Sequence, residues 1–499
     1  MTVESSASGV VGDAAREAAG AGDGVPEIAD AHPSSDGQFH SGTRGSSDDR
    51  WGVLRHRHYR NILGAQFISN IGTWTEMFVI QMFVAQTTGR LDDQGMLGVC
   101  QQAPIFALGL FGGLTADRVN RRTLLVVSQM LAGLVAAGVA VVSMTHFQNP
   151  RSAVHWLFLL GAINGVVMSF NFPAWQVLTP RLVPRDELVK AITLNGIQFN
   201  MARVLGPAIA GWVFARYGGP PLLWFNTVTF FMMGAVVMTT PNSPVAKGSG
   251  EPIWHQIAEA LRFLLHERGP RAVLIAQVLL SLLAAPLVRL LSNFVIDVYG
   301  LDISAAAAAA GTLLAIQGVG AVVGGLSLRY IPSWYPKHHF IPMAVSGLGI
   351  SICVFALTTT LWAGYAAMAV CGWFWIWGFN QSWAALQVIT PDRLRGRALS
   401  LATVASFGGT AVGVFIAGQL GEMAKDHHLL TAAQATQGSV LILSVPLALA
   451  GLWMMTHRVP EVDGLPPASE SSLGRRNFID AITARAHRPV EVTEPVEST

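Results

Sequence analysis

Long apolar stretches separated by short polar segments make up the chain from about residue 60 to residue 456. A helix of about 20 apolar residues crosses the hydrocarbon core of a bilayer. Lipid offers no water to unpaired backbone groups, so each stretch is expected to be helical. The pattern predicts twelve membrane-crossing helices, at residues 60–86, 95–116, 123–147, 153–178, 191–215, 221–240, 271–298, 305–328, 339–360, 362–386, 398–422 and 437–456.

The composition agrees with a membrane protein. Hydrophobic residues make up 51% of the chain and charged residues 12%, whereas a soluble domain carries about 25% charge. The net charge of +2 is too small to indicate a nucleic-acid-binding protein. Cys100, Cys353 and Cys371 form no CxxC pair, so they are interpreted as small apolar core residues.

Lysine and arginine are distributed unevenly among the connections between the predicted helices. With a cytoplasmic N-terminus, the inner connections contain Arg118, Arg121, Arg122, Arg181, Arg185, Lys190, Lys247, Arg262, Arg268, Arg271, Arg329, Lys337, Arg393, Arg395 and Arg397. The outer connections contain Arg90, Arg151, Arg216 and Lys425. Because cytoplasmic loops carry the excess of basic residues, this bias predicts a multi-pass membrane protein with both termini in the cytoplasm.

The middle connection divides the twelve predicted helices into six and six. Residues 241–270 begin with a linker composition and continue as "IWHQIAEALRFLLHER", whose apolar residues share one helical face. This predicts an amphipathic helix at the membrane surface between an N-terminal six-helix bundle at 51–240 and a C-terminal one at 271–456. The polar segments 1–50 and 457–499 are predicted to be cytoplasmic tails, the first of them disordered.

The two halves also resemble each other in sequence. "WQVLTPRLVPRDELVKAITLN" is echoed by "ALQVITPDRLRGRALSLATVA", and "FGGLTADR" is echoed more weakly by "VGGLSLRY". Past a four-residue difference in loop length, Gly206 aligns with Gly413 and Gly211 with Gly418. Two related six-helix halves are typical of transporters that rock about a binding site near the membrane midplane.

The segment "GGLTADRVNRR" at 112–122 lies between the second and third predicted helices. Its residues Gly113, Asp117, Arg118, Arg121 and Arg122 are similar in type and spacing to motif A of the major facilitator superfamily. "NMARVLGPAIAG" and "TPRLVPRDEL" resemble the subfamily of transmembrane secretion effectors. The resemblance covers about residues 51–456. It implies an all-α integral membrane fold of 12 helices in two pseudo-symmetric six-helix bundles, and efflux of drugs or siderophores as the function.

The resemblance implies a gating role for motif A. In the superfamily the aspartate faces the start of the eleventh helix, which here begins near Arg395, and a helix N-terminus stabilises a carboxylate. Asp117 and the arginines after it are therefore expected to latch the two halves at the cytoplasmic end, with a solvated loop as the alternative. Thr115 and Asn120 replace the usual leucine and glycine, and Arg329 replaces the acid in the second-half copy, so a full latch is expected in the first half alone.

Glu76 is the acid inside the first predicted helix, where Gln66, Ser69, Thr73 and Glu76 share a face. A charged side chain at the bilayer centre costs about 2.5–3.5 kcal/mol, so it is rarely left facing lipid. Two roles remain open for Glu76. It either binds and releases protons during transport, or it lines a cavity as a hydrogen-bonding group.

Two arginines lie within predicted helices and are expected to face the protein interior for the same reason. Arg203 lies one turn from Asn200, and Arg289 precedes Asn293 and Asp297 on one helical face. The arginines either neutralise Glu76 and Asp297 or meet an anionic substrate such as a catecholate or carboxylate. Of these two roles, pairing with the acids is the favoured one for the arginines.

The fifth predicted helix contains "ARVLGPAIAG". Its small residues, Gly206 and Gly211 among them, allow close helix contact, and Pro207 removes one backbone hydrogen bond. The segment resembles motif C of antiporters, although alanines take two of the usual glycine positions and the leading glycine is missing. The resemblance favours export over uptake.

"WFWIWGFNQSW" in the tenth predicted helix combines aromatic rings with amides, which suits a large amphipathic ligand. Residues two apart point in different directions on a helix, so the four tryptophans cannot all line one cavity. Packing or placement at the membrane interface is the favoured role for them. Trp373 and Trp377, one turn apart, are the pair predicted to face a ligand.

Sequence motifs of enzymes, such as Walker A, HExxH and GxSxG, do not occur in the chain. The sequence therefore predicts a monomeric transporter in the lipid bilayer, without cofactor, metal or nucleic-acid partner. It is predicted to export small amphipathic molecules in exchange for protons. A metabolite uptake permease or facilitator is the alternative within transport, and a membrane scaffold or sensor that does not transport is the alternative from another class.

Overall fold

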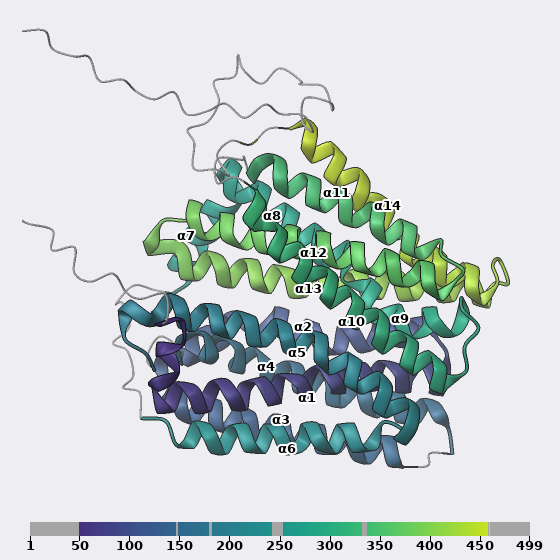
Figure 1. Cartoon of the computed structure of the whole chain (residues 1–499), viewed down its shortest axis with the longest axis horizontal. Helices are drawn as coiled ribbons and strands as arrows, with labels where there is room; N and C mark the ends of the chain where they lie inside the picture. Colours follow the sequence, from purple (N-terminus) through teal and green to yellow (C-terminus); the bar gives the residue numbers. More distant parts are fainter. Residues whose placement is uncertain are drawn as a thin grey trace, which may run out of the picture. The chain divides into compact units, whose positions relative to one another are not determined.

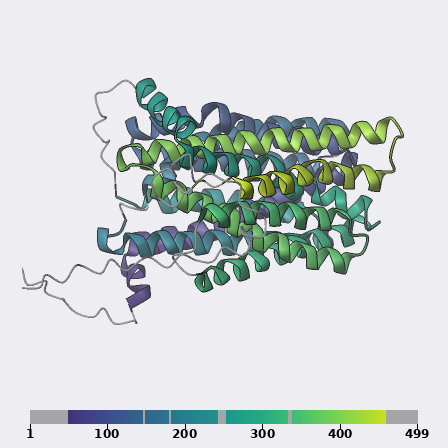
Figure 2. The same ribbon diagram turned by 90° about the horizontal axis from the view of Figure 1, so that it is seen from above.

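The computed structural model describes residues 49–145, 148–178, 182–241, 253–331, 337–457 and 459. The predicted tails at 1–50 and 457–499 lie outside the described residues, except for Asp49, Arg50, His457 and Val459. Nearly all described residues are helical, and the long helices run roughly parallel in two perpendicular views (Figures 1 and 2).

The helices follow the chain in the predicted order. The first half contains η1 (Asp49–Arg55), α1 (Arg57–Thr88), α2 (Leu91–Arg118), α3 (Arg121–Met144), α4 (Pro150–Leu178), η3 (Arg185–Glu187), α5 (Leu188–Tyr217) and α6 (Pro220–Met238). The second half contains α7 (Ile253–His266), α8 (Arg268–Leu279), η4 (Leu280–Ala284), α9 (Pro286–Asp297), α10 (Ile303–Ser327), η5 (Leu328–Tyr330), α11 (Lys337–Ala356), α12 (Leu361–Ile389), α13 (Asp392–Asp426) and α14 (Ala432–Thr456).

Within the described residues, nine helical segments are long and apolar enough to cross a membrane. Three further helices, α1, α5 and α12, are 32, 30 and 29 residues long, which is also long enough to cross a membrane. These three and the nine are consistent with the twelve predicted crossings. A charged side chain is costly to expose to lipid, so Glu76 of α1 and Arg203 of α5 are expected to turn inward.

The helices pack mainly within their own half of the chain. In the first half α1 packs against α5 and α6, and α3 packs against α4 and α6. In the second half α12 packs against α10 and α11, and α11 packs against α14. The two halves meet chiefly where α2 runs along α13 and α5 runs along α10 (Figure 1).

Glycines allow close approach at both crossings between the halves. A Cβ atom added to Gly211 would lie 2.6 Å from the carbonyl oxygen of Ala307 and 2.9 Å from the Cα of Gly311. A Cβ atom added to Gly418 would lie 2.5 Å from the carbonyl oxygen of Leu91 and 3.1 Å from the Cα of Gly95. The sequence repeat aligns Gly211 with Gly418, and the structure gives both glycines the same position at equivalent crossings.

The second aligned pair of glycines also occupies equivalent positions, within each half. Gly206 packs against α1, where an added Cβ atom would lie 2.6 Å from the Cβ of Trp74, and it is followed by the buried Pro207. Gly413 packs against the carbonyl oxygen of Leu282, in η4. The small face predicted for the fifth helix thus contacts α1 through Gly206 and α10 through Gly211.

The predicted helix at 271–298 is interrupted in the structure. It consists of α8, one π-helical turn (η4) and α9, with Pro286 at the start of α9. The amide of Ala285 donates to the carbonyl of Leu280 at 3.3 Å, one residue further back than in an α-helix. Proline lacks an amide hydrogen and cannot continue the preceding ladder, and such turns mark breaks within long helices.

The amphipathic helix predicted at 253–268 corresponds to α7, which packs against α8 and α13. Ala260 and Leu264 are buried, and Glu259 forms an ion pair with Arg393 of α13. Leu261 and Leu265, on the predicted apolar face, are 41% and 46% exposed. Exposed leucines on such a helix suit contact with a membrane surface.

Candidate functional site

Glu76 lies at the contact between α1 and α6. Its carboxylate accepts a hydrogen bond from the side-chain amide of Asn226, which is fully buried and also accepts from the hydroxyl of Thr229 at 3.2 Å. Gly72, one turn before Glu76, makes room for this pair, because an added Cβ atom would overlap the side chain of Asn226. The partner of Glu76 is therefore a neutral amide of the same half, rather than one of the two arginines.

The other polar residues predicted around Glu76 are more dispersed. The Thr73 hydroxyl donates to the carbonyl of Ser69 at 3.0 Å, and the Asn200 amide donates to the carbonyl of Gly196 at 2.8 Å, so both bond to their own helices. Gln66 is half-buried on α1. A contact between α1 and α5 is made instead by the amides of Asn70 and Gln198, which are 3.1 Å apart.

The side chain of Arg203, in the first half, contacts the second half. Its guanidinium carbon lies 5.4 Å from the ring centroid of Trp375 on α12, which is the geometry of a cation–π contact. Among the described side chains, the ion pairs do not include Arg203. Pairing with an acid, the favoured prediction for this arginine, is therefore replaced by stacking on an aromatic ring.

Arg289 also crosses between the halves. Its guanidinium donates to the side-chain oxygen of Gln101 on α2 at 2.7 Å, and 8% of the residue is exposed. One turn later, the amide of Asn293 donates to the carbonyl of Gly89 at 3.1 Å. The predicted shared face of Arg289 and Asn293 therefore meets the first half. Asp297 instead pairs with Lys425 at 2.9 Å and accepts from Thr436 at 2.6 Å.

The aromatic residues of α12 divide between two faces. Trp373 and Trp377, the predicted ligand pair, have ring centroids 5.8 Å apart, and the indole of Trp377 donates to the carbonyl of Gly324 on α10 at 2.8 Å. Phe340 of α11 packs on Trp377 at 4.6 Å. This pair therefore packs within the second half, and Trp375 is the tryptophan that faces Arg203. Periodicity separates the two faces but does not identify which one turns toward the first half.

Motif A occupies the end of α2 and the start of α3. Nothing is described for the side chains of Gly113, Asp117 and Arg118, so the predicted latch to α13 lies outside the described part of the chain. Asn120, which replaces the usual glycine, caps α3 by accepting from the amide of Arg122 at 3.0 Å. Arg122 donates to the carbonyl of Met238 at the end of α6, and Arg121 is buried. Arg122 thus supports a helix end of its own half.

A charged cluster at the other end of the bundle was not predicted. We call this end, where α1 ends and α2 begins, the Arg90 end. Arg90 lies 3.1 Å from Asp426 and 3.5 Å from Glu422 of α13, and a further pair at 2.9 Å joins it to Asp92. Glu422 also accepts from the backbone amide of Leu91 at 2.7 Å. From the sequence, Arg90 is simply one of the few basic residues outside the predicted inner connections.

Gly89 completes this cluster. It ends α1 with a φ of 64°, a left-handed conformation that glycine adopts without strain. Its carbonyl accepts from Asn293 at 3.1 Å and from Lys425 at 3.5 Å. Together with the crossings at Gly211 and Gly418, these contacts join the two halves at the Arg90 end.

Replacing Arg90 with Gln is expected to open the Arg90 end more often. The variant loses the charge-assisted contacts to Asp426 and Glu422, and a loss of about 1.4 kcal/mol corresponds to a tenfold change in population. Spin labels at Gln148 and Leu429, in two connections at this end, should show a larger share of long distances. Arg216→Gln removes an equal charge from an exposed site at the end of α5 and is the control. Equal distance distributions in both variants would rule out a closing role for Arg90.

Comparison with known proteins gives one family and several related transporters. Residues 48–485 match the family described as transmembrane secretion effector. The enterobactin exporter EntS of Salmonella choleraesuis (strain SC-B67) is 23% identical over 368 residues, which cover 74% of this chain and 86% of that protein. EntS of Escherichia coli O1:K1 / APEC is 23% identical over 394 residues, which cover 79% of this chain and 92% of that protein.

Solved structures of transporters share the fold. The nucleoside transporter NupG is similar with a TM-score of 0.61 and 15% identity, over 81% of this chain and 100% of that one. A bacterial homologue of the human lysosomal transporter Spinster, in an inward-facing and occupied conformation, has a TM-score of 0.64 and 13% identity. The match covers 84% of this chain and 99% of that one. The all-α fold of a membrane transporter, predicted from the sequence, is therefore confirmed.

Proposed function

We propose that this chain, which belongs to the transmembrane secretion effector family of major facilitator transporters, exports a small anionic aromatic molecule across a bacterial inner membrane. The curated relatives that support export are named as exporters of enterobactin. A siderophore-like compound with catecholate or carboxylate groups fits this proposal. The termini are cytoplasmic in this proposal, so the Arg90 end faces outward.

The observation that carries the substrate class is the position of Arg203. A guanidinium inside a membrane protein is stabilised by a counter-charge or by an aqueous cavity, yet Arg203 stacks on Trp375 with no carboxylate among its described ion-pair partners. Arg289 adds a second cation at the seam between the halves, held by the neutral Gln101. A cation–aromatic pair that belongs to both halves favours an anionic ligand with an aromatic ring.

Alternating access follows from the division of contacts between the ends of the bundle. The described contacts that join Arg90, Gly89 and Asn293 to the other half support a state closed at the Arg90 end. Opening toward the outside would break these contacts, and closing the opposite end would engage motif A. The two six-helix halves then rock about the substrate near the midplane.

Proton coupling is assigned to Glu76. In Glu76→Gln the side chain keeps its hydrogen-bonding partner Asn226 but can no longer exchange a proton. If one proton moves per substrate, a gradient of one pH unit supports about a tenfold concentration ratio. The variant is expected to lose this accumulation while still exchanging substrate down its own gradient. Glu267→Gln, at an exposed position between α7 and α8, is the control. Persistent proton-driven accumulation in Glu76→Gln would remove the coupling role.

Everted membrane vesicles that contain the protein test the function directly. With an acidic interior, an exporter coupled to protons should accumulate enterobactin inside the vesicle, whereas a cationic dye should not accumulate. Accumulation of the dye in place of the anion would overturn the substrate class. Flux of enterobactin that ignores the pH gradient would indicate a facilitator. The absence of any flux would favour a scaffold that does not transport.

A further inference from the structure

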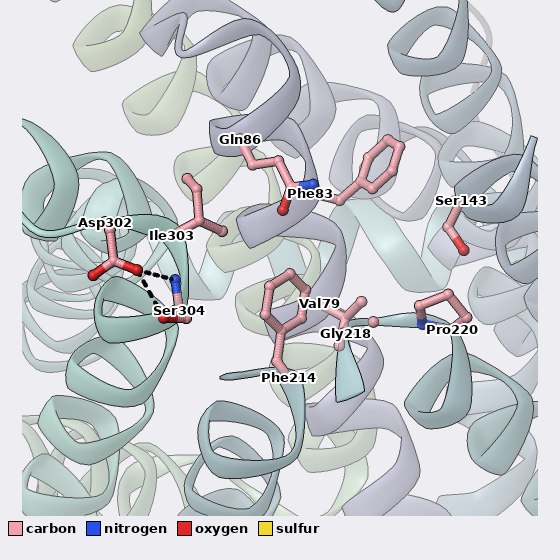
Figure 3. A pocket seen from close by; sticks show the side chains of 11 residues that line it. Val79, Phe83, Gln86, Ser143, Phe214, Gly218, Pro220, Asp302, Ile303 and Ser304 are labelled. Carbon is pink, nitrogen blue, oxygen red and sulfur yellow. Dashed lines mark hydrogen bonds between the residues drawn. The ribbon is translucent and has the colours of Figure 1, made fainter. Parts of the chain in front are cut away.

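A cavity of about 460 Å³ lies at the Arg90 end, away from the candidate substrate site (Figure 3). Its walls come from the ends of α1, α3 and α5, the start of α6 and the start of α10, so both halves contribute. Phe214 lies 11 residues after Arg203 on α5, which corresponds to about 16 Å along a helix. The cavity is therefore separate from the contact of Arg203 with Trp375, and Arg203, Arg289 and Trp375 are not among its lining residues.

The chemistry of the cavity is aromatic and acidic. The rings of Phe83 and Phe214 lie across from Ile303, and Asp302 stands at the edge (Figure 3). The Asp302 carboxylate caps α10 by accepting from the amide and the hydroxyl of Ser304, at 3.2 and 2.7 Å. These hydrogen bonds hold the pKa of Asp302 below its usual range, so the carboxylate stays negative at neutral pH.

A ligand that carries a positive charge next to an apolar group would match the aromatic and acidic lining of this cavity. Phenyl rings attract an organic cation through their faces, and a carboxylate at the edge adds charge attraction. The volume lies within the range of pockets that bind small molecules. We propose that the cavity binds a small aromatic ammonium ion, and that the bound ion holds the Arg90 end closed and inhibits transport.

Inhibition follows from which elements line the cavity. Asp302, Ile303 and Ser304 are the second half's contribution, and Val79, Phe83 and Phe214 belong to the first half. When the Arg90 end opens, α10 must move away from α1 and α5, and the two walls separate. A ligand that binds one state better than the other shifts the population toward that state, so occupancy favours the closed end.

Calorimetry with the purified protein in nanodiscs tests the site, with benzyltrimethylammonium as the probe and neopentylbenzene as its neutral isostere. Asp302→Asn removes the charge and keeps a good helix cap, since asparagine and aspartate cap equally well. Because Asp302 is exposed to solvent, its charge attracts a cation only modestly, so this variant should bind the cation several-fold more weakly and bind the isostere as the parent does. In transport assays the cation should slow export, and the Gln148–Leu429 label distances should shorten.

Two further variants locate the site and distinguish a specific loss of binding from misfolding of the protein. Phe83→Leu should weaken cation binding, whereas Phe225→Leu, at an exposed position on α6, should not. Equal affinity in Asp302→Asn and the parent, or no saturable binding, would overturn the proposal. Loss of cation binding in Trp375→Leu but not in Phe83→Leu would assign the cation to the substrate site and also overturn it. These readouts measure binding of the probe, so they remain informative whatever the exported substrate is.

Discussion

Replacing Arg203 with Gln is expected to reduce export of an anionic aromatic substrate by about 10- to 100-fold, because a hydrogen bond to a charged group contributes about 1.5–3 kcal/mol. The same change should leave the protein as stable as before or more stable. Removing a charge that has no described counter-charge also removes the free-energy cost of holding it away from water. Transport in vesicles and thermal unfolding in detergent measure the two effects.

The opposite signs of these effects separate a substrate-binding role from a structural one. If Arg203 served mainly to hold α5 against α12, Arg203→Gln would lower the melting temperature together with transport. Arg203→Lys keeps the charge but not the planar stack on Trp375, so it should retain part of the activity. Trp375→Leu should impair export more than Trp373→Leu, because Trp373 packs within the second half. Undiminished export by Arg203→Gln would refute the assigned role.

Replacing both Gly211 and Gly418 with Ala is expected to reduce transport by about tenfold or more. Each new Cβ atom would lie within 2.6 Å of a backbone carbonyl oxygen, at the two crossings between the halves. Backbone atoms cannot move aside as a flexible side chain can, and overpacking of this kind costs about 1–3 kcal/mol at each site. The halves should separate at the Arg90 end, and the Gln148–Leu429 label distances should lengthen.

The same two helices provide matched controls. An added Cβ atom at Gly196 on α5 or Gly396 on α13 would meet no heavy atom of the described residues within 4 Å, apart from its own helix backbone and chain neighbours. Alanine is favoured over glycine inside a helix by about 0.5–1 kcal/mol, so Gly196→Ala and Gly396→Ala should be fully active. If these controls lost as much transport as the crossing variants, close approach of the halves would not explain the effect.

The helical architecture could be predicted from the sequence because each membrane-spanning helix corresponds to one continuous run of apolar residues. The pattern at 60–86 predicted α1, and the sequence repeat aligned Gly211 with Gly418, which lie at equivalent crossings in the structure. Aspects of the site that depend on distant partners were not accessible. Arg90 contacts Asp426 across 336 positions of sequence, and an isolated arginine in a short loop carries no information about such a partner.

Rotational orientation was a second limit. The sequence separated Trp373 and Trp377 from Trp375, but the choice of face depends on which neighbour packs against each side of α12. Asn226 was missed for a related reason. Its position in an apolar helix is a usable signal, since a buried amide needs a partner, but the sequence does not reveal that this partner is Glu76.

The π-helical turn η4 determines the direction in which the side chains of α9 point around the helix axis. Each residue of an α-helix advances the side chains by about 100° around the axis, so the extra residue in this turn redirects the whole of α9. Arg289 and Asn293 meet Gln101 and Gly89 in this altered phase. A regular helix from Arg268 to Asp297 would carry the same sequence but would point both side chains elsewhere. The single π-helical turn, which packs against Gly413, therefore orients the two side chains that join α9 to the first half.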